Sequence, residues 1–225
     1  MKERSRLAVF DVDGTLIDSQ HVIVAAMLAA CQANGVAAPK PEAVRRIIGL
    51  SLLDAVGQLL PHYGAELHVS VAQAYKQAFL EARGGGGEGE PLFPGAVAAL
   101  EALEQAGWQL AIATGKSQRG LDSMIQRHGL QGRFVSLQTA DHHPSKPHPA
   151  MLSKAIADAG VMPADAVMIG DTSFDMAMGR NAKSRCVGVA WGYHAPEELL
   201  DAGAEKVVEN FSLLPGAMMS LFERA

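Results

Sequence analysis

The sequence lacks three features that mark large classes of proteins. Its two cysteines, Cys31 and Cys186, lie far apart and without the spacing of zinc ligands, which argues against a disulfide scaffold or a zinc ribbon. Basic residues are not in excess, and the formal net charge of −5 offers no positive field for nucleic acid. The apolar run 22–31 is too short to span a bilayer. We therefore expect neither a nucleic-acid partner nor a membrane segment.

The N-terminal residues also lack the pattern of a secretion signal. Residues 1–6 are basic, but only the apolar residues 7–10 follow before Asp11, which is too short for a signal-peptide core. We expect a soluble, cytoplasmic protein. Its 225 residues suit one domain or a domain with an insertion, and 48% apolar residues are enough to build a full core.

The first recognisable motif follows residues 7–10, whose apolar side chains predict a strand buried on both faces. At the end of this strand stands Asp11-Val12-Asp13-Gly14-Thr15. Ligands of open α/β sheets bind beyond the carboxyl ends of the strands, and two carboxylates at that place favour a cation. Gly14 lets the backbone approach a bound group closely. An acidic turn alone would explain one Asp and the Gly, but not the similar segments further along the chain.

A long helical insertion is predicted after this motif, because the next α/β unit begins only near Pro94 and the gap exceeds an ordinary loop. Asp18 or Ser19 is the predicted cap of its first helix. The glycine-rich segment 84–89 is interpreted as part of the return connection, since no strand precedes it as a phosphate-binding loop would require. The predicted helices of the insertion are 20–34, 41–48, 50–60 and 67–83.

From Pro94 onward, strands and helices alternate. This order predicts α/β architecture with a parallel, doubly wound sheet. The predicted strands are 109–113, 134–137, 167–169 and 186–190, and the predicted helices are 96–106, 117–128, 149–159 and 174–181. Residues 197–202, 207–208 and 213–222 are expected to complete the fold.

Two loops after the insertion carry residues suited to an anion. Thr114 and Gly115 end a strand before a helix and offer a hydroxyl and free N–H groups, although such a pair is often only a turn. Lys146 stands before Pro147 and Pro149, which restrict the backbone, so its ammonium either points at one fixed place or is a solvated surface group. Adjacent His142 and His143 lack the spacing of a metal template, but either could touch a substrate.

The strand predicted over 167–169 is followed by the strongest further evidence for a cation site. It ends in Gly170-Asp171, and Asp175 follows within one turn. Two carboxylates placed in this way bind a hard cation directly and through water. The alternative is structural: Asp171 as a helix cap and Asp175 as a partner of the helix dipole.

In order and spacing, these segments resemble the four motifs of the haloacid dehalogenase-like superfamily. The insertion resembles the helical cap of one of its subfamilies, and residues 10–19 are most similar to the phosphoglycolate phosphatase branch. The resemblance implies a Rossmann-like core formed by residues 1–16 and 92–225, with a helical cap formed by 17–91. The matching residues are Asp11-Val12-Asp13-Gly14-Thr15, Thr114, Lys146 and Gly170-Asp171 with Asp175.

The resemblance also implies a Mg²⁺-dependent phosphatase acting on a small phosphorylated metabolite, such as phosphoglycolate or a sugar phosphate. Asp11 would attack phosphorus and form an aspartyl-phosphate. Asp13 would protonate the leaving alkoxide and then deprotonate the attacking water. The Asp11 carboxylate, the Asp13 carbonyl and Asp171 would hold the Mg²⁺, with Asp175 acting through water. The phosphoryl oxygens would be bound by Thr114, Lys146 and the N–H groups of Gly14 and Gly115.

Several alternatives stay open within and beyond this family. A 2-haloacid dehalogenase needs neither the metal nor the second Asp, so Asp13 argues against it. A phosphonatase usually lacks an acid at that position, whereas a sugar phosphomutase keeps it and depends on cap residues. An inactive phosphate-binding regulator would keep the fold alone. Arg45 and Gly49 lie where related caps carry specificity groups, although a lone Arg on a helix is usually solvated.

Overall fold

The computed structural model describes residues 5–84 and 89–223 and contains one sheet of six parallel strands. The strand order β3-β2-β1-β4-β5-β6 confirms the predicted doubly wound α/β fold. The order reverses between β1 and β4, and this is where such folds bind ligands. The strands are β1 (Arg6–Phe10), β2 (Trp108–Thr114), β3 (Phe134–Thr139), β4 (Ala166–Gly170), β5 (Arg185–Val189) and β6 (Lys206–Val208).

Helices cover both faces of the sheet. In β1, Phe10 belongs to one hydrophobic cluster and Val9 to the other, so the strand is buried on both faces as predicted. No helix of residues 5–84 and 89–223 is long and apolar enough to cross a membrane. The core helices are α5 (Ala96–Gln105), α6 (Gln118–Arg127), α7 (Ala150–Ala159), α8 (Ser173–Asn181), α9 (Pro196–Ala202) and α10 (Leu214–Ser220), with short turns η1 (Pro163–Asp165) and η2 (Phe211–Leu213).

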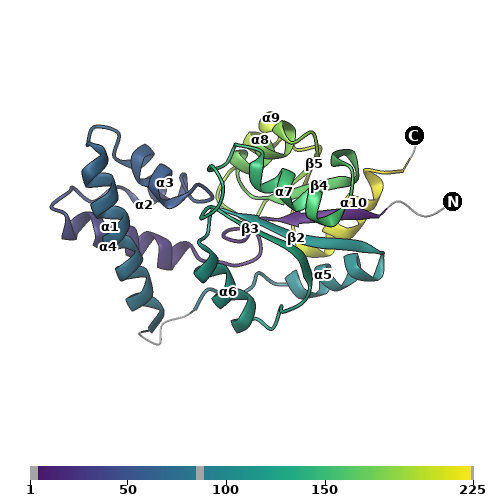
Figure 1. The fold of residues 1–225 in the computed structure, drawn as a ribbon, viewed down its shortest axis with the longest axis horizontal. Coiled ribbons are helices and arrows are strands. Elements are labelled where there is room, and N and C mark those ends of the chain that lie inside the picture. Colours follow the sequence, from purple (N-terminus) through teal and green to yellow (C-terminus); the bar gives the residue numbers. More distant parts are fainter. Residues whose placement is uncertain (1–4, 85–88, 224–225) are drawn as a thin grey trace.

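The predicted helical insertion is confirmed between β1 and α5. Its helices lie beyond the carboxyl ends of the strands (Figure 1) and share a hydrophobic cluster of their own that includes Met27, Val44 and Val71. The boundaries 17 and 91 stay predictions, and residues 85–88 of the expected return connection lie outside the described residues. The insertion contains α1 (Gln20–Ala33), α2 (Pro41–Arg45), α3 (Leu52–Leu59) and α4 (Ala65–Gly84). We call it the cap.

The capping prediction for α1 is wrong in its chemistry. Ser19 precedes the helix, but its side chain makes no hydrogen bond to the first turn. The hydroxyl instead donates to Asp13 Oδ1 at 2.6 Å. A capping hydroxyl would accept a hydrogen bond from a backbone N–H of the first turn, but here the side chain is directed at a carboxylate, a strong acceptor for its proton. Ser19 therefore belongs to the site rather than to the helix.

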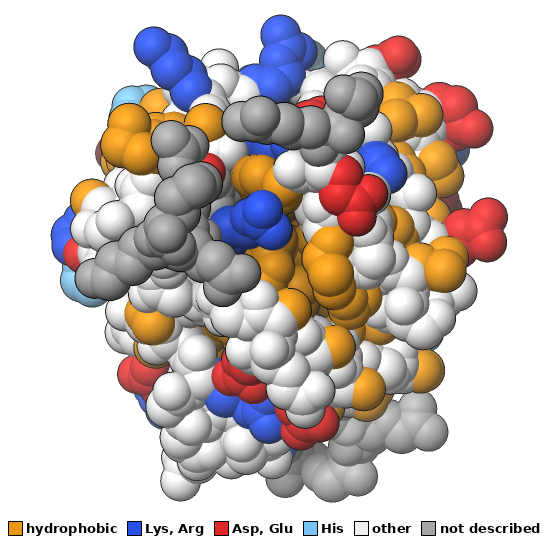
Figure 2. Space-filling view, turned by 90° about the vertical axis from the view of Figure 1, so that its right-hand side faces the viewer, with side chains coloured by type: hydrophobic (Ala, Val, Ile, Leu, Met, Phe, Trp, Pro, Cys, Tyr) orange, Lys and Arg blue, Asp and Glu red, His pale blue; other side chains and the backbone are white. Residues whose placement is uncertain are grey.

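The opposite end of the core, which Figure 2 faces, carries the amino ends of the strands and a central group of apolar side chains. The guanidinium of Arg6 lies 4.4 Å from the ring centre of Phe222 and 5.7 Å from that of Trp108. Arg185 lies 5.0 Å from the same Phe222 ring. These cation–π contacts attach the C-terminal segment to the ends of β1, β2 and β5.

Two helical glycines provide a test of the packing. A Cβ at Gly179 in α8 would lie 2.2 Å from Cys186 Sγ, whereas a Cβ at Gly216 in α10 would meet no heavy atom within 4 Å. Gly179→Ala should lower the free energy of unfolding by about 1–3 kcal/mol through overpacking. Gly216→Ala, the matched control, should raise it by about 0.4–1 kcal/mol. Urea unfolding measures both, and an equal change in the two variants would contradict this packing.

Candidate active site

Three buried carboxylates meet where the strand order reverses. Asp11 follows β1, and its N–H donates to the Ile169 carbonyl of neighbouring β4 at 2.9 Å. Asp171 follows β4, and Asp175 stands in the first turn of α8. One carboxylate oxygen from each of the three lies within 4.8 Å of the others, and all three residues have 0% exposure.

Close backbone approach fixes the Asp171 carboxylate. Its Oδ1 accepts a hydrogen bond from Thr15 Oγ1 at 2.8 Å, and its Oδ2 accepts one from the Tyr193 N–H at 3.0 Å. A Cβ at Gly14 would lie 2.3 Å from Asp171 Oδ2, and a Cβ at Gly192 would lie 2.1 Å from Asp171 Cβ. Gly14 also has a φ of +85°. Both positions therefore require glycine.

The alternative that Asp171 and Asp175 serve only the start of α8 is half right. Thr172, not Asp171, caps α8, and Asp175 completes a capping box by accepting from the Thr172 N–H at 3.1 Å. The other Asp175 oxygen forms an ion pair with Lys146 Nζ at 2.7 Å. Asp175 thus caps the helix with one oxygen and contributes to the carboxylate cluster with the other.

Lys146 is a buried residue of the site, so the surface alternative is wrong. Its side chain has 0% exposure, and Nζ lies 2.8 Å from Asp11 Oδ1. Burial works to lower the pKa of Lys146, but Asp11 and Asp175 outweigh this effect and hold the pKa above its usual value. The ammonium is therefore charged, and it compensates only part of the negative charge around it.

The cluster fits a hard divalent cation. Burial raises the pKa of Asp11 from 3.8 to about 7, although Lys146 opposes the shift. Burial, Asp175 and Asp11 raise the pKa of Asp171 well above 3.8. Among the described residues, Asp11 Oδ2 is buried and accepts no hydrogen bond. Unsatisfied carboxylate oxygens with excess negative charge form the donor set that Mg²⁺ or Mn²⁺ prefers.

Asp13 has a different environment, outside this cluster. Its Oδ1 accepts hydrogen bonds from Ser19 Oγ at 2.6 Å and from Lys116 Nζ at 2.8 Å. Lys116 also donates to Glu90 Oε1 at 2.9 Å. Lys116, Glu90 and Ser19 were not among the site residues predicted from the sequence. A lysine directly after Thr114-Gly115 was the available signal, because that loop ends a strand beside β1.

The loop that begins with Thr114 and Gly115 lies under a loop of the cap. Thr114 ends β2 with 1% exposure, and its hydroxyl accepts a hydrogen bond from the Lys116 N–H at 3.2 Å. A Cβ at Gly115 would lie 2.5 Å from the carbonyl oxygens of Gly49 and Leu50. A Cβ at Gly49 would lie 3.9 Å from Asp11 Oδ2. The predicted cap position Gly49 therefore reaches the carboxylate cluster through its backbone.

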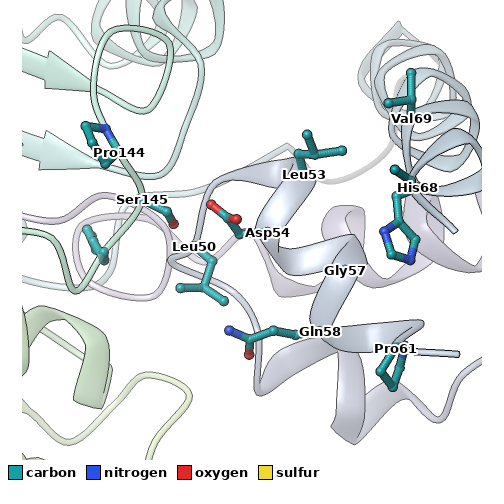
Figure 3. A pocket seen from close by; sticks show the side chains of 12 residues that line it. Leu50, Leu53, Asp54, Gly57, Gln58, Pro61, His68, Val69, Pro144 and Ser145 are labelled. Atoms are coloured by element: carbon teal, nitrogen blue, oxygen red, sulfur yellow. The ribbon is translucent and has the colours of Figure 1, made fainter. Parts of the chain in front are cut away.

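Two cavities flank this cap loop. One, of about 920 Å³, lies between cap and core and is lined by Asp13, Lys116, Tyr75 and Phe79 among others. The other, of about 880 Å³, lies between α3, the start of α4 and the loop that leads to Lys146, as Figure 3 shows. Asp13 lines the first cavity and Lys146 lines the second, so the two residues stand on opposite sides of the loop.

Three other predicted residues lie apart from these contacts. Arg45 donates through Nε to Gln20 Oε1 at 2.9 Å and does not line either cavity. His143 contacts Gln138 Oε1 at 2.7 Å, and His142 is exposed. Within the described chain, the group suited to a metal consists of Asp11, Asp171 and Asp175 and contains no histidine.

Comparison with known proteins gives a consistent result. The family model of haloacid dehalogenase-like hydrolases matches residues 8–189. "Probable phosphatase IndB" of Dickeya dadantii is 33% identical over 219 residues, covering 96% of this chain and 95% of that protein. A phosphoglycolate phosphatase of Psychrobacter arcticus is 29% identical over 224 residues, with coverages of 96% and 97%. The crystal structure of a hydrolase from Pseudomonas syringae superposes with a TM-score of 0.86 at 26% identity, covering 98% of this chain and 100% of that chain.

Metal binding can be tested without measuring activity. Excess Mg²⁺ should stabilise the folded protein, by about 2.7 kcal/mol at a concentration 100 times the dissociation constant. Asp171→Asn should remove most of this increment because it removes a cluster carboxylate. Asp122→Asn, at an exposed residue of α6, is the matched control and should keep it. Thermal unfolding with Mg²⁺ against Na⁺ at equal ionic strength measures the increment, and an unchanged increment in Asp171→Asn would place the ion elsewhere.

The metal-free protein should also show a characteristic pH dependence. Between 3.8 and about 7, the folded state binds more protons at Asp11 than the unfolded state does. The contribution of Asp11 to the free energy of unfolding therefore decreases as the pH rises through this window. Urea unfolding in EDTA should show this slope, and Asp11→Asn should reduce it. A wild-type slope equal to that of Asp11→Asn would refute the assignment.

Proposed function

Because the chain belongs to the family of haloacid dehalogenase-like hydrolases, we propose that it hydrolyses small phosphate monoesters with Mg²⁺ and through an aspartyl-phosphate. The observation that carries this proposal is the contrast between two carboxylates that are separated by one residue. Asp11 is buried among carboxylates beside Lys146, whereas Asp13 lines the cavity and accepts hydrogen bonds on one oxygen. Two titratable groups in such unlike environments suit a nucleophile and an acid–base group.

In this proposal, Asp11 attacks phosphorus and the alcohol leaves from the opposite side. Asp13 gives its proton to the departing oxygen, and later removes a proton from the water that cleaves the phosphoenzyme. Lys146 holds both the Asp11 carboxylate and a phosphoryl oxygen, with help from Thr114 and the Gly115 N–H. Asp11, Asp171 and the Asp13 carbonyl, with Asp175 in support, would hold a divalent cation, which would neutralise charge between the nucleophile and the phosphate.

The substrate is proposed to be a small phosphorylated metabolite that enters the cavity between cap and core. The cap loop at Gly49 and Leu50 lies close above Gly115, which suits the exclusion of water and of bulky partners. Phosphoglycolate is the first candidate because relatives bear the name phosphoglycolate phosphatase. A cytoplasmic location and the absence of nucleic-acid and membrane partners stay predictions.

The proposal is tested by release of inorganic phosphate from a panel of phosphorylated metabolites. Turnover should need Mg²⁺ or Mn²⁺ and should stop in excess EDTA. Full phosphate release in EDTA would contradict the metal-dependent mechanism, and halide release from a 2-haloacid would instead favour the dehalogenase, which needs no metal. Conversion of one sugar phosphate into its isomer without phosphate release would favour the mutase. A protein that binds phosphate but releases none would be the inactive regulator.

The two aspartates should respond differently to the leaving group. Asp11→Asn should abolish turnover of every substrate. Asp13→Asn should slow an alkyl phosphate by about 10²- to 10⁴-fold, since an alkoxide needs its proton. Nitrophenolate leaves without a proton, so p-nitrophenyl phosphate should still form the phosphoenzyme and give a burst of nitrophenol. Rapid mixing measures the burst, and equal losses on both substrates without a burst would assign Asp13 a different task.

A further inference from the structure

One oxygen of the Asp13 carboxylate is held by a buried network of charged groups. Among the described residues, the hydrogen bonds to its side chain come from Ser19 Oγ and Lys116 Nζ, and both are made to Oδ1. A carboxyl group that transfers a proton to a substrate needs one oxygen directed at the leaving group. Fixing Oδ1 from two directions restricts rotation of the carboxyl plane and leaves Oδ2 for that contact.

Lys116 is well suited to this restraint because it has little freedom of its own. Its side chain has 7% exposure, and Nζ lies 2.9 Å from Oε1 of Glu90, whose side chain has 1% exposure. Nζ also lies 5.4 Å from the ring centre of Phe79 in α4. A buried ammonium is costly unless it is paired. With two carboxylates to pair with, it stays charged and keeps one position between them.

Glu90 connects this network to the segments that join cap and core. It stands immediately before Pro91, whose carbonyl accepts a hydrogen bond from the Asp18 N–H at 2.8 Å. Its own carbonyl contacts His128 Nε2 at 2.9 Å. Ser19 lies on the segment that leads from β1 into the cap, and Glu90 lies on the segment that leads back to the core. Both connecting segments therefore act on Asp13, Ser19 directly and Glu90 through Lys116.

We propose that Lys116, anchored by Glu90, is a positioning residue that orients Asp13 for proton transfer to the leaving group. This inference rests on the proposed phosphatase function. Two other roles give different results. A structural ion pair would change stability and affect every substrate equally. A direct contact between Lys116 and substrate would raise KM and would act independently of Asp13.

The test compares Lys116→Met, which keeps the length of the side chain, on two substrates. The first substrate is the alkyl phosphate, from phosphoglycolate and the metabolite panel, that wild type hydrolyses best. On this substrate kcat should fall about 10²-fold, the lower end for general acid catalysis, and KM should change little. The nitrophenol burst from p-nitrophenyl phosphate should slow by less than about 10-fold, since this leaving group needs no proton. Equal losses on the two substrates would overturn the inference.

Two further variants separate positioning from stability. Lys116→Met leaves Glu90 buried without its lysine, so it should lower the melting temperature. Lys116→Met with Glu90→Gln removes that charge and should recover stability, but not kcat on the alkyl phosphate. Recovery of both would assign Lys116 a structural role. Lys154→Met removes a lysine with 54% exposure from an i,i+4 pair and is the control that should keep wild-type kinetics.

A double-mutant cycle with Asp13→Asn completes the test. If Lys116 acts through Asp13, Lys116→Met should have almost no further effect in the Asp13→Asn background. Multiplying effects would show that Lys116 acts on the substrate directly and would overturn the inference. Metal-dependent phosphate release by wild type tests the proposed function by itself, so failure of either proposal can be distinguished from failure of the other.

Discussion

The ion pairs of a single buried lysine with the carboxylates beside it are the interaction on which the site depends. Lys146 contacts Asp11 and Asp175 at 2.8 and 2.7 Å, and Asp171 completes the cluster without contacting it. Charged groups are buried only where a rigid scaffold supplies partners. Here the scaffold is the sheet, because β1 and β4 are neighbours and end at the same edge. Lys146 does not neutralise all three carboxylates, and the remaining negative charge makes the site suited to a divalent cation.

Small residues make this concentration of charge possible. Gly14 and Gly192 leave room for Asp171, and at Gly170 a Cβ would lie 2.3 Å from the carboxyl carbon of Asp175. The same device brings the cap to the core, since Gly115 faces the Gly49 carbonyl without a side chain between them. Close approach of backbone and carboxylates therefore sets both the geometry of the cluster and the position of the cap loop.

The different surroundings of Asp11 and Asp13 assign different chemistry to two residues that only Val12 separates. Asp11 lies in the carboxylate cluster, where we propose that it acts as the nucleophile. Asp13 lies at the cavity, where Ser19 contacts it from the segment that enters the cap and Lys116 contacts it from the core loop after β2. Since Glu90 belongs to the return segment, the arrangement of the cap and the orientation of the proposed acid are physically connected. A rigid core thus carries the nucleophile, and the junction with the cap carries the acid.

Local patterns in the sequence were sufficient for the elements and their order. Apolar strands followed by Asp11 and by Gly170-Asp171, and helices between them, determine a parallel sheet whose polar ends converge, because strand and helix formation depend on neighbouring residues. Tertiary structure alone decided the partners of individual side chains. Lys116 and Asp13 are 103 residues apart, and no local pattern specifies such a contact. Asp18 or Ser19 was expected to accept a hydrogen bond from the first turn of a helix, but the fold places a carboxylate beside Ser19, and its hydroxyl donates to that carboxylate instead.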